Sequence, residues 1–176
     1  MRDRDAAGRP RNARPRDAYG RPLPRGAAGE PTMPDDLDLP PAEALARAQA
    51  LLDADRPFHA HEVLEAVWKA SPAGERELWR GLAQVAVGLT HLRRGNSRGA
   101  VALLTRAADR LEPFGPVPNP HGIDVGGVLR QVRELAEHPD PATPARLRLI
   151  TRTPDVTLPG PVHPGAPDPE GSRPKR

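Results

Sequence analysis

The residues best suited to chemistry are a histidine and a glutamate four positions apart, His61 and Glu65, followed by Trp68. Residues at i and i+4 share one face of an α-helix, with Cβ atoms about 5–6 Å apart. Such a pair can bind one divalent ion from a single helix, or act as a base and a proton shuttle. Because a lone ionised carboxylate on this largely apolar face would be costly, we expect Glu65 to be paired, protonated or bound to a ligand.

Partners for this pair are expected on the next helix. If the two helices are antiparallel with their turn near residue 73, His61 faces Gln84 and Glu65 faces Arg80 or its neighbour. In one interpretation Arg80 pairs with Glu65 and Gln84 with His61, and the polar network only fixes the register of the helices. The same register brings Trp68 close to Trp79.

A second interpretation makes these residues a binding site. Two glycines inside the third predicted helix, Gly81 and Gly88, cost helix stability and therefore indicate close backbone approach. In this interpretation they leave a cavity that holds a small ligand or an ion, with Glu65 as ligand or base and His61 as ligand or proton shuttle. The predicted ligand-binding residues are His61, Glu65, Trp68, Arg80, Gln84 and His91.

A metal site built on His61 and Glu65 is the sharper hypothesis. Nitrogen and oxygen ligands without thiolate suit zinc, manganese or iron. A zinc site needs three protein ligands. The third-ligand candidates are His59 and Glu62, which point away from the centre of the face, and His91, nearly a helix length from Glu65. The pattern is also His-Glu-x-x-Glu, which lacks the second histidine of the metalloprotease signature. A buried and satisfied polar network is therefore favoured over a metal.

Apolar residues recur at helical spacing throughout the middle of the chain, and no segment alternates long enough to form a strand. We predict helices over about 41–54 and 57–70, a third that starts at Ser71-Pro72 and runs to about Arg94, a fourth that Ser97 caps and that runs to Leu111, and a fifth that Asp124 caps. Ser71, Ser97 and Asp124 are the expected caps. The fold class is all-α, a compact bundle of about five helices built from antiparallel hairpins.

Charge and proline divide the chain of 176 residues into three parts. We predict a disordered Arg/Pro-rich tail over 1–36, a helical domain over 37–150 and a disordered Pro-rich tail over 151–176. Eight arginines give the first tail its positive charge, but Tyr19 is its one side chain that can stack on a base. We therefore expect a solvated tail and no nucleic-acid binding. Because Met33 precedes the helical domain, translation from Met33 is an alternative to Met1.

Several classes of protein are excluded by composition. The chain has no cysteine, which removes disulfides, thiolate metal sites and a cysteine nucleophile. Its longest apolar stretch is too short to span a bilayer, and no basic segment leads into an apolar one near Met1. We expect a soluble cytoplasmic protein, for which a homo-oligomer remains open.

Two blocks resemble a known family. The run from Phe58 to Lys69, with His61, Glu65 and Trp68 in a His-x3-Glu-x2-Trp pattern, and the later run with Gly81-Leu82-x-Gln84, His91 and Gly95-Asn96 are similar to the bacterial and archaeal family called domain of unknown function 309. The resemblance covers roughly 42–112. It implies a small all-α fold and a metal-binding or catalytic role for the motif, and it brings no substrate.

Three functions follow as hypotheses. The first is an uncharacterised protein whose polar pocket binds a small ligand or ion through the residues named above. The second is a metal-dependent hydrolase that uses His61 and Glu65. The third is a helical-hairpin interaction module in which the motif belongs only to the core. The second of these hypotheses makes the protein an enzyme, and the first and third do not require catalysis.

Overall fold

The computed structural model describes residues 14–31, 33–34, 37–142 and 147–150. Five α-helices form the domain, together with one short 3-10 helix. They are α1 (Pro41–Asp53), α2 (Pro57–Ala70), α3 (Ala73–Arg93), α4 (Ser97–Leu111), η1 (Glu112–Phe114) and α5 (Val125–Glu137). The predicted all-α class is confirmed.

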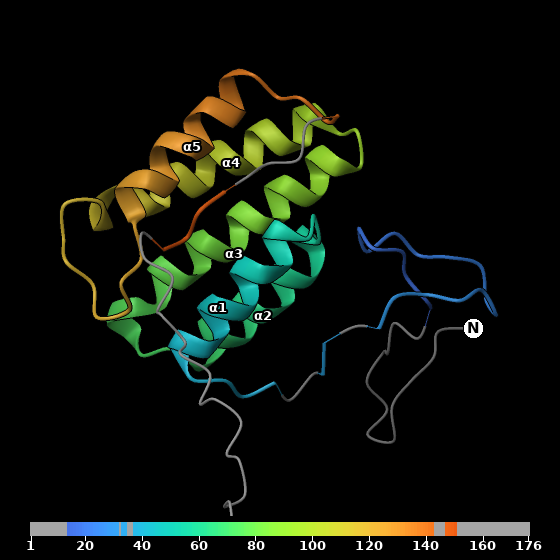
Figure 1. Cartoon of the computed structure of the whole chain (residues 1–176). Helices are drawn as coiled ribbons and strands as arrows, with labels where there is room; N and C mark the ends of the chain where they lie inside the picture. Colours follow the sequence, from blue (N-terminus) through green and yellow to red (C-terminus); the bar gives the residue numbers. More distant parts are fainter. Residues whose placement is uncertain (1–13, 32, 35–36, 143–146, 151–176) are drawn as a thin grey trace, which may run out of the picture.

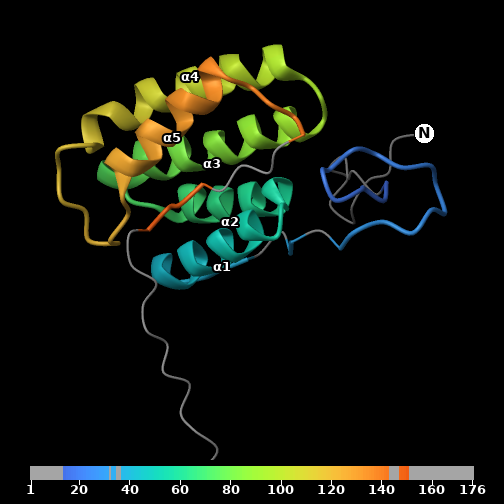
Figure 2. The same cartoon turned by 45° about the horizontal axis from the view of Figure 1, so that its top comes forward.

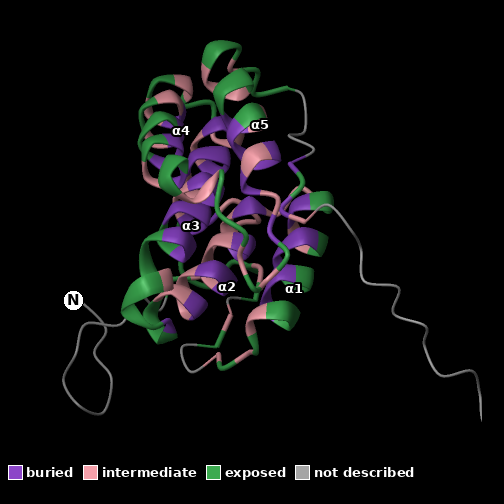
Figure 3. Ribbon diagram, turned by 90° about the vertical axis from the view of Figure 1, so that its left-hand side faces the viewer, coloured by how far each residue is buried: buried purple, intermediate pink, exposed green. Residues whose placement is uncertain are grey.

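The helices are stacked in three layers (Figures 1 and 2). The antiparallel pair α1 and α2 lies on one side of α3, and the pair α4 and α5 lies on the other. Helix α3 packs against both α2 and α4, whereas α1 packs on α2 and α5 on α4. The buried faces of the helices meet in the interior (Figure 3). Because α3 is buried on both sides, its sequence is apolar around most of its circumference.

Proline and side-chain caps define where the helices begin. Pro57 starts α2, where its fixed φ suits the first turn and its missing N–H costs nothing. Asp124 caps α5 as predicted, and its carboxylate accepts a hydrogen bond from Gly127 N at 2.9 Å. The cap of α4 is Asn96, whose side-chain oxygen accepts from Gly99 N at 2.9 Å, and not the predicted Ser97.

The two glycines of α3 mark close contacts with α4. A Cβ at Gly81 would lie 2.7 Å from a methyl of Leu111, and one at Gly88 would lie 2.8 Å from a methyl of Leu104. The prediction of close approach is confirmed. The leucines of α4 fill the space beside these glycines, which therefore do not open a cavity toward α2.

The last described residues, 147–150, form an extended strap between α1 and α5 (Figure 1). The Gln49 side chain of α1 donates to Leu147 O at 3.0 Å and accepts from Leu149 N at 2.8 Å. From α5, the Gln131 side chain accepts from Arg148 N at 3.0 Å. Both strap leucines are buried in the core, so the strap completes the domain.

The N-terminal segment departs from the predicted disordered tail over residues 14–31. This segment folds into turns and lies at the end of the bundle where α2 begins and α3 ends (Figure 2). Isolated bridges join Arg16 to Pro22 and to Glu30. Its low apolar content suggested disorder, but hydrogen bonds and ion pairs to the helices hold it. Residues 1–13 and 151–176, for which disorder is also predicted, lie outside the described residues.

Candidate functional site

The motif histidine and glutamate lie side by side on α2, and Lys69 extends them into a row of three charged or polar side chains. His61 Nε2 lies 3.4 Å from Glu65 Oε2, and Lys69 Nζ lies 3.2 Å from Glu65 Oε1. The side chains of His61 and Glu65 are 24% and 32% exposed, so the pair is half-buried. Glu65 is thus satisfied within its own helix, by a residue four positions on.

The surroundings of the His61 ring favour its neutral form. Burial lowers the pKa of His61 below its ordinary value, the Glu65 carboxylate opposes this shift, and the Lys69 ammonium adds to it. The ring also lies against Phe58, with 6.1 Å between the ring centroids. A neutral imidazole keeps one nitrogen lone pair free to accept a proton or bind an ion.

The predicted pairing of Arg80 with Glu65 is wrong. The Arg80 guanidinium lies over the Trp68 ring, 5.3 Å from its centroid, and its NH1 lies 3.5 Å from Glu77 on the same helix. Because Glu65 takes Lys69 from its own helix, Arg80 is free to cover the aromatic face. Trp68 packs at the edge of the core, as a wall of the motif face.

The remaining predicted ligands do not join the pair. Gln84 accepts a hydrogen bond from Arg110 of α4 at 3.3 Å and is not the hydrogen-bond partner of His61. His91 lies at the far end of α3, where its Nδ1 is 3.0 Å from the Asn96 side-chain nitrogen. Gln84 and His91 lie on the face of α3 that points to α4 and to the α3–α4 turn, because residues at different positions of a helix point in different directions.

The other polar residues of α2 lie under the N-terminal segment. His59 is 2% exposed, and its Nε2 is 3.1 Å from Pro31 O. Its Nδ1 is buried without a hydrogen-bond partner among the described residues. Glu62 accepts a hydrogen bond from Met33 N at 3.2 Å. Burial raises the pKa of Glu62, and the hydrogen bond from Met33 opposes the rise.

A second polar cluster holds Tyr19 of the N-terminal segment. Its hydroxyl donates to Asp55 Oδ2 at 3.1 Å, and its carbonyl accepts from Arg94 Nε at 2.8 Å. Arg93 pairs with the same Asp55 oxygen at 2.5 Å and lies 5.9 Å from the Tyr19 ring centroid. The segment is therefore bound by charged groups at the α1–α2 turn and the end of α3.

Gly20 makes the tightest contact of this segment. It is buried with φ of +72°, and a Cβ there would lie 2.3 Å from the Phe58 ring. Arg16 completes the contact: its NH1 donates to Gly20 O at 2.6 Å, and its guanidinium lies 5.8 Å from the Phe58 centroid. We call the residues Asp55, Phe58, His59, Glu62, Arg93 and Arg94 the docking surface.

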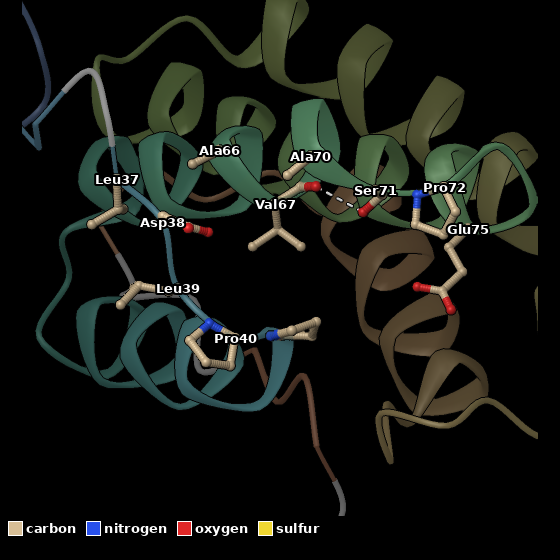
Figure 4. Close-up of a pocket in the computed structure, with 11 residues that line it drawn as sticks. Leu37, Asp38, Leu39, Pro40, Ala66, Val67, Ala70, Ser71, Pro72 and Glu75 are labelled. Carbon is tan, nitrogen blue, oxygen red and sulfur yellow. Dashed lines mark hydrogen bonds between the residues drawn. The ribbon is translucent and has the colours of Figure 1, made fainter.

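An open cavity of about 340 Å³ lies elsewhere, between the start of α1 and the end of α2 (Figure 4). Leu39, Val67 and Ser71 line it, and Ser71 Oγ donates to Val67 O at 2.7 Å. The predicted ligand-binding residues are not among those that line it. Most of its walls are apolar, and the carboxylates of Asp38 and Glu75 also belong to its lining.

Glu75, at the rim of the cavity, belongs to a third polar cluster. Its Oε2 lies 2.8 Å from His121 Nε2 and accepts from the fully buried Trp79 at 3.3 Å. Trp79 packs on the His121 ring, at 5.1 Å between centroids, and not on Trp68 as the register predicted. The cluster joins the loop before α5 to α3.

The described residues do not supply a metal site. Within them, no group of three or more His, Asp or Glu side chains is placed to hold a metal ion. His61 and Glu65 provide two ligands, His59 faces Pro31, and His91 is at the other end of α3. The donor set therefore falls short of the three that a zinc site needs.

Three groups of interacting residues escaped sequence reasoning. Tyr19 and Asp55 are 36 positions apart, Glu75 and His121 are 46 apart, and Gln49 and Leu149 are 100 apart. No local pattern marks such pairs. The one available signal was Gly20, a glycine beside the chain's single tyrosine, which indicates a turn but not its partner.

The fold and the motif define a small helical-bundle protein with a His-x3-Glu-x2-Trp pattern on its second helix. Residues 45–103 match the model of the family described as Domain of unknown function (DUF309), which confirms the resemblance seen in the sequence. The chain is also similar to the "Uncharacterized protein YpuF" of Bacillus subtilis (strain 168), with 35% identity over 81 residues. This match covers 46% of the chain and 47% of the relative, so the chain spans about half of the relative's length. No solved structure matches the chain.

In the part of the chain that the structure describes, no helix is long and apolar enough to cross a membrane. Neither the family description nor the printed name of the relative states an activity or a ligand.

Proposed function

We propose that the protein is an interaction module that binds a folded-back polypeptide segment on the docking surface. One observation carries the proposal: side chains of the helical domain hold the chain's own residues 14–31 and 33 through main-chain groups. Arg94 binds Tyr19 O, His59 binds Pro31 O and Glu62 binds Met33 N. Hydrogen bonds to the main chain of a bound segment give affinity in several modes of peptide recognition.

The motif has a structural role in this proposal. The row of His61, Glu65 and Lys69 and the stack of Arg80 on Trp68 satisfy the polar groups of α2. They hold the helix that presents Phe58, His59 and Glu62 to the segment. The half-buried His61 ring touches Phe58, so it supports the docking surface from the side.

The test uses the full-length chain with its own segment displaced. Gly20→Val places a branched side chain against the Phe58 ring, which should release residues 14–31 and leave the docking surface open. A fluorescein-labelled peptide of residues 14–34 should then bind saturably to this variant. The wild type should bind at least about tenfold more weakly, because its tethered segment competes at a high effective concentration.

Two arginines provide the matched control. Arg94→Ala in the Gly20→Val chain removes the donors to Tyr19 O and should weaken peptide binding by about tenfold. Arg98→Ala changes an exposed arginine of α4 and should leave binding unchanged. If hydrogen exchange shows that residues 14–31 are released and the peptide still does not bind, the proposal is wrong. It is also wrong if these residues stay protected from exchange in the variant.

Ion binding by His61 and Glu65 remains the alternative that the sequence predicted. Elemental analysis of the wild type beside His61→Ala, after dialysis without chelator, separates the two functions. An interaction module should carry no stoichiometric metal in either chain. Near-stoichiometric zinc, manganese or iron in the wild type, lost in His61→Ala, would favour the ion-binding function and the hydrolase hypothesis.

A further inference from the structure

We propose, building on the interaction function above, that the docking surface selects an Asp-x-Tyr-Gly turn, so that its partner is a protein segment with this sequence. The chain's own Asp17-Ala18-Tyr19-Gly20 occupies the surface in the structure and acts as an internal competitor of that partner. A different set of contacts supports the choice of residue at each of the three defined positions of this turn, Asp17, Tyr19 and Gly20.

At the tyrosine position, the docking surface recognises the side-chain hydroxyl. Asp55 Oδ2 accepts from the Tyr19 hydroxyl at 3.1 Å and from Arg93 Nε at 2.9 Å, so the carboxylate is held in place by the arginine. Arg93 also lies near the ring face. A phenylalanine would fill the same space and lose the hydrogen bond to this half-buried carboxylate, which would keep only Arg93. Loss of a hydrogen bond to a charged group weakens binding.

At the glycine position, the docking surface leaves no room for a side chain. The Phe58 ring occupies the place that a Cβ of residue 20 would take, at 2.3 Å. The backbone there has φ of +72°, which side chains of L-residues disfavour. Gly26 has a similar φ of +87° but nothing within 4 Å of a Cβ. Glycine is therefore needed at position 20 for contact as well as for conformation.

The aspartate position shapes the turn. Asp17 Oδ1 accepts from Tyr19 N at 3.0 Å and from Arg21 N at 2.8 Å, and Asp17 O accepts from Gly20 N at 2.9 Å. These bonds lie within the segment, so the aspartate folds the turn before it meets the surface. Arg94 then binds the Tyr19 carbonyl that the turn exposes.

The experiment measures competition by variant peptides. Labelled peptide of residues 14–34 is bound to the full-length Gly20→Val chain and displaced by unlabelled wild-type, Tyr19→Phe, Gly20→Ala or Gly26→Ala peptide. Tyr19→Phe should weaken competition by about tenfold, since it removes one hydrogen bond to a charged group. Gly20→Ala should weaken it at least about tenfold more than Gly26→Ala, because both carry the backbone strain and only the first meets Phe58.

A compensating variant tests the contact itself. Phe58→Ala in the Gly20→Val chain removes the ring and should erase most of the difference between the Gly20→Ala and Gly26→Ala peptides. Circular dichroism checks that this chain keeps its helices. If Phe58→Ala unfolds the chain, the comparison of the four peptides on the Gly20→Val chain decides whether position 20 requires glycine.

The outcomes separate the two proposals. Equal competition by all four peptides, with the dependence on Arg94 retained, would overturn the Asp-x-Tyr-Gly specificity and leave the interaction function standing. Absence of binding by every peptide, the wild-type one included, would overturn the interaction function. A loss with Gly26→Ala as large as that with Gly20→Ala would assign the glycine to strain alone and overturn the steric part of the specificity.

Discussion

The His61 imidazole lies beside a carboxylate and an ammonium on α2. Glu65 and Lys69 follow His61 at four-residue intervals, and the Glu65 carboxylate lies between the His61 ring and the Lys69 ammonium. The negative carboxylate and the positive ammonium therefore shift the pKa of His61 in opposite directions. Such rows stabilise an exposed helix by a few tenths of a kcal/mol per pair and hold the side chains in place. The structural role proposed for the motif needs neither an ion nor a substrate.

The titration of His61 tests this arrangement. Glu65→Gln should lower the pKa of His61 further, because the carboxylate favours the imidazolium, and Lys69→Met should raise it. The measurement is the NMR pH titration of the His61 ring. Glu43→Gln, an exposed change in α1, should leave the midpoint in place.

The same shift has a consequence for stability. Because the pKa of folded His61 lies below that of the unfolded chain, protonation favours unfolding. The neutral His61 ring therefore contributes to the free energy of unfolding above the unfolded pKa of histidine, about 6.5, and this contribution is lost as the pH falls below that value. Glu65→Gln should enlarge the loss. A pKa of His61 that rises in Glu65→Gln would contradict the arrangement.

At the scale of helices, the close packing of α3 on α4 depends on glycine at two positions. Gly88→Ala should lower the free energy of unfolding by about 1–3 kcal/mol, because the new methyl meets Leu104 at 2.8 Å. Gly74→Ala on the same helix meets nothing within 4 Å and should raise it by up to about 1 kcal/mol. Urea unfolding of both variants is the measurement. Equal effects would show that α4 does not need the space.

The side-chain amides that hold the strap over 147–150 are Gln49, which is buried, and Gln131, which is half-buried. Gln49→Ala leaves Leu147 O and Leu149 N without partners and should cost about 2–4 kcal/mol. Gln131→Ala removes the bond from the exposed Arg148 N and a bond to Gly127 O within α5, and should cost about 0.5–1.5 kcal/mol because neither leaves a buried group without a partner. Denaturant unfolding of the two variants compares them. A Gln131→Ala effect as large as that of Gln49→Ala would mean that the strap does not depend on the buried clamp.

At the scale of the whole molecule, Glu75 joins the loop before α5 to the centre of the bundle. The hydrogen bond from His121 lowers the pKa of Glu75, burial opposes this, and the Trp79 indole adds to the lowering. Because the folded pKa lies below the unfolded one, the contribution to stability is present above the unfolded pKa of about 4.3 and is lost as the pH falls through the folded pKa.

The pH dependence of unfolding checks this link. Between about pH 5 and pH 3 the wild type should lose more stability than Glu75→Gln, which has no carboxylate to protonate. Urea unfolding at several pH values gives the slopes. Glu134→Gln, exposed on α5, should keep the slope of the wild type. Equal slopes for the wild type and Glu75→Gln would exclude this contribution.

The N-terminal segment changes how the whole molecule is understood. Low apolar content predicted a tail, and a segment of this kind buries little apolar surface. Residues 14–31 are instead held by Tyr19, Gly20 and the ion pair of Glu30 with Arg56 at 3.0 Å. Charged partners compensate for the missing apolar contacts. A chain begun at Met33 would lack the segment and leave Phe58 and His59 uncovered.

Local rules acting on the sequence determined the helices and the place of the motif. The bounds of α2, 57–70, follow from Pro57 and from apolar spacing, and the close approach at Gly81 and Gly88 follows from the cost of glycine inside a helix. These signals involve residues within one or two helical turns, so no knowledge of the fold is needed to read them.

Only the tertiary structure decided which polar groups meet. Glu65 had a partner in Lys69 on its own helix and another in Arg80 across the turn, and packing selected the first. Partners for Tyr19, Glu75 and Gln49 lie 36 to 100 residues away. Long-range pairs depend on the path of the chain through space, which periodicity does not encode, and so the docking surface became visible only once the helices were in place.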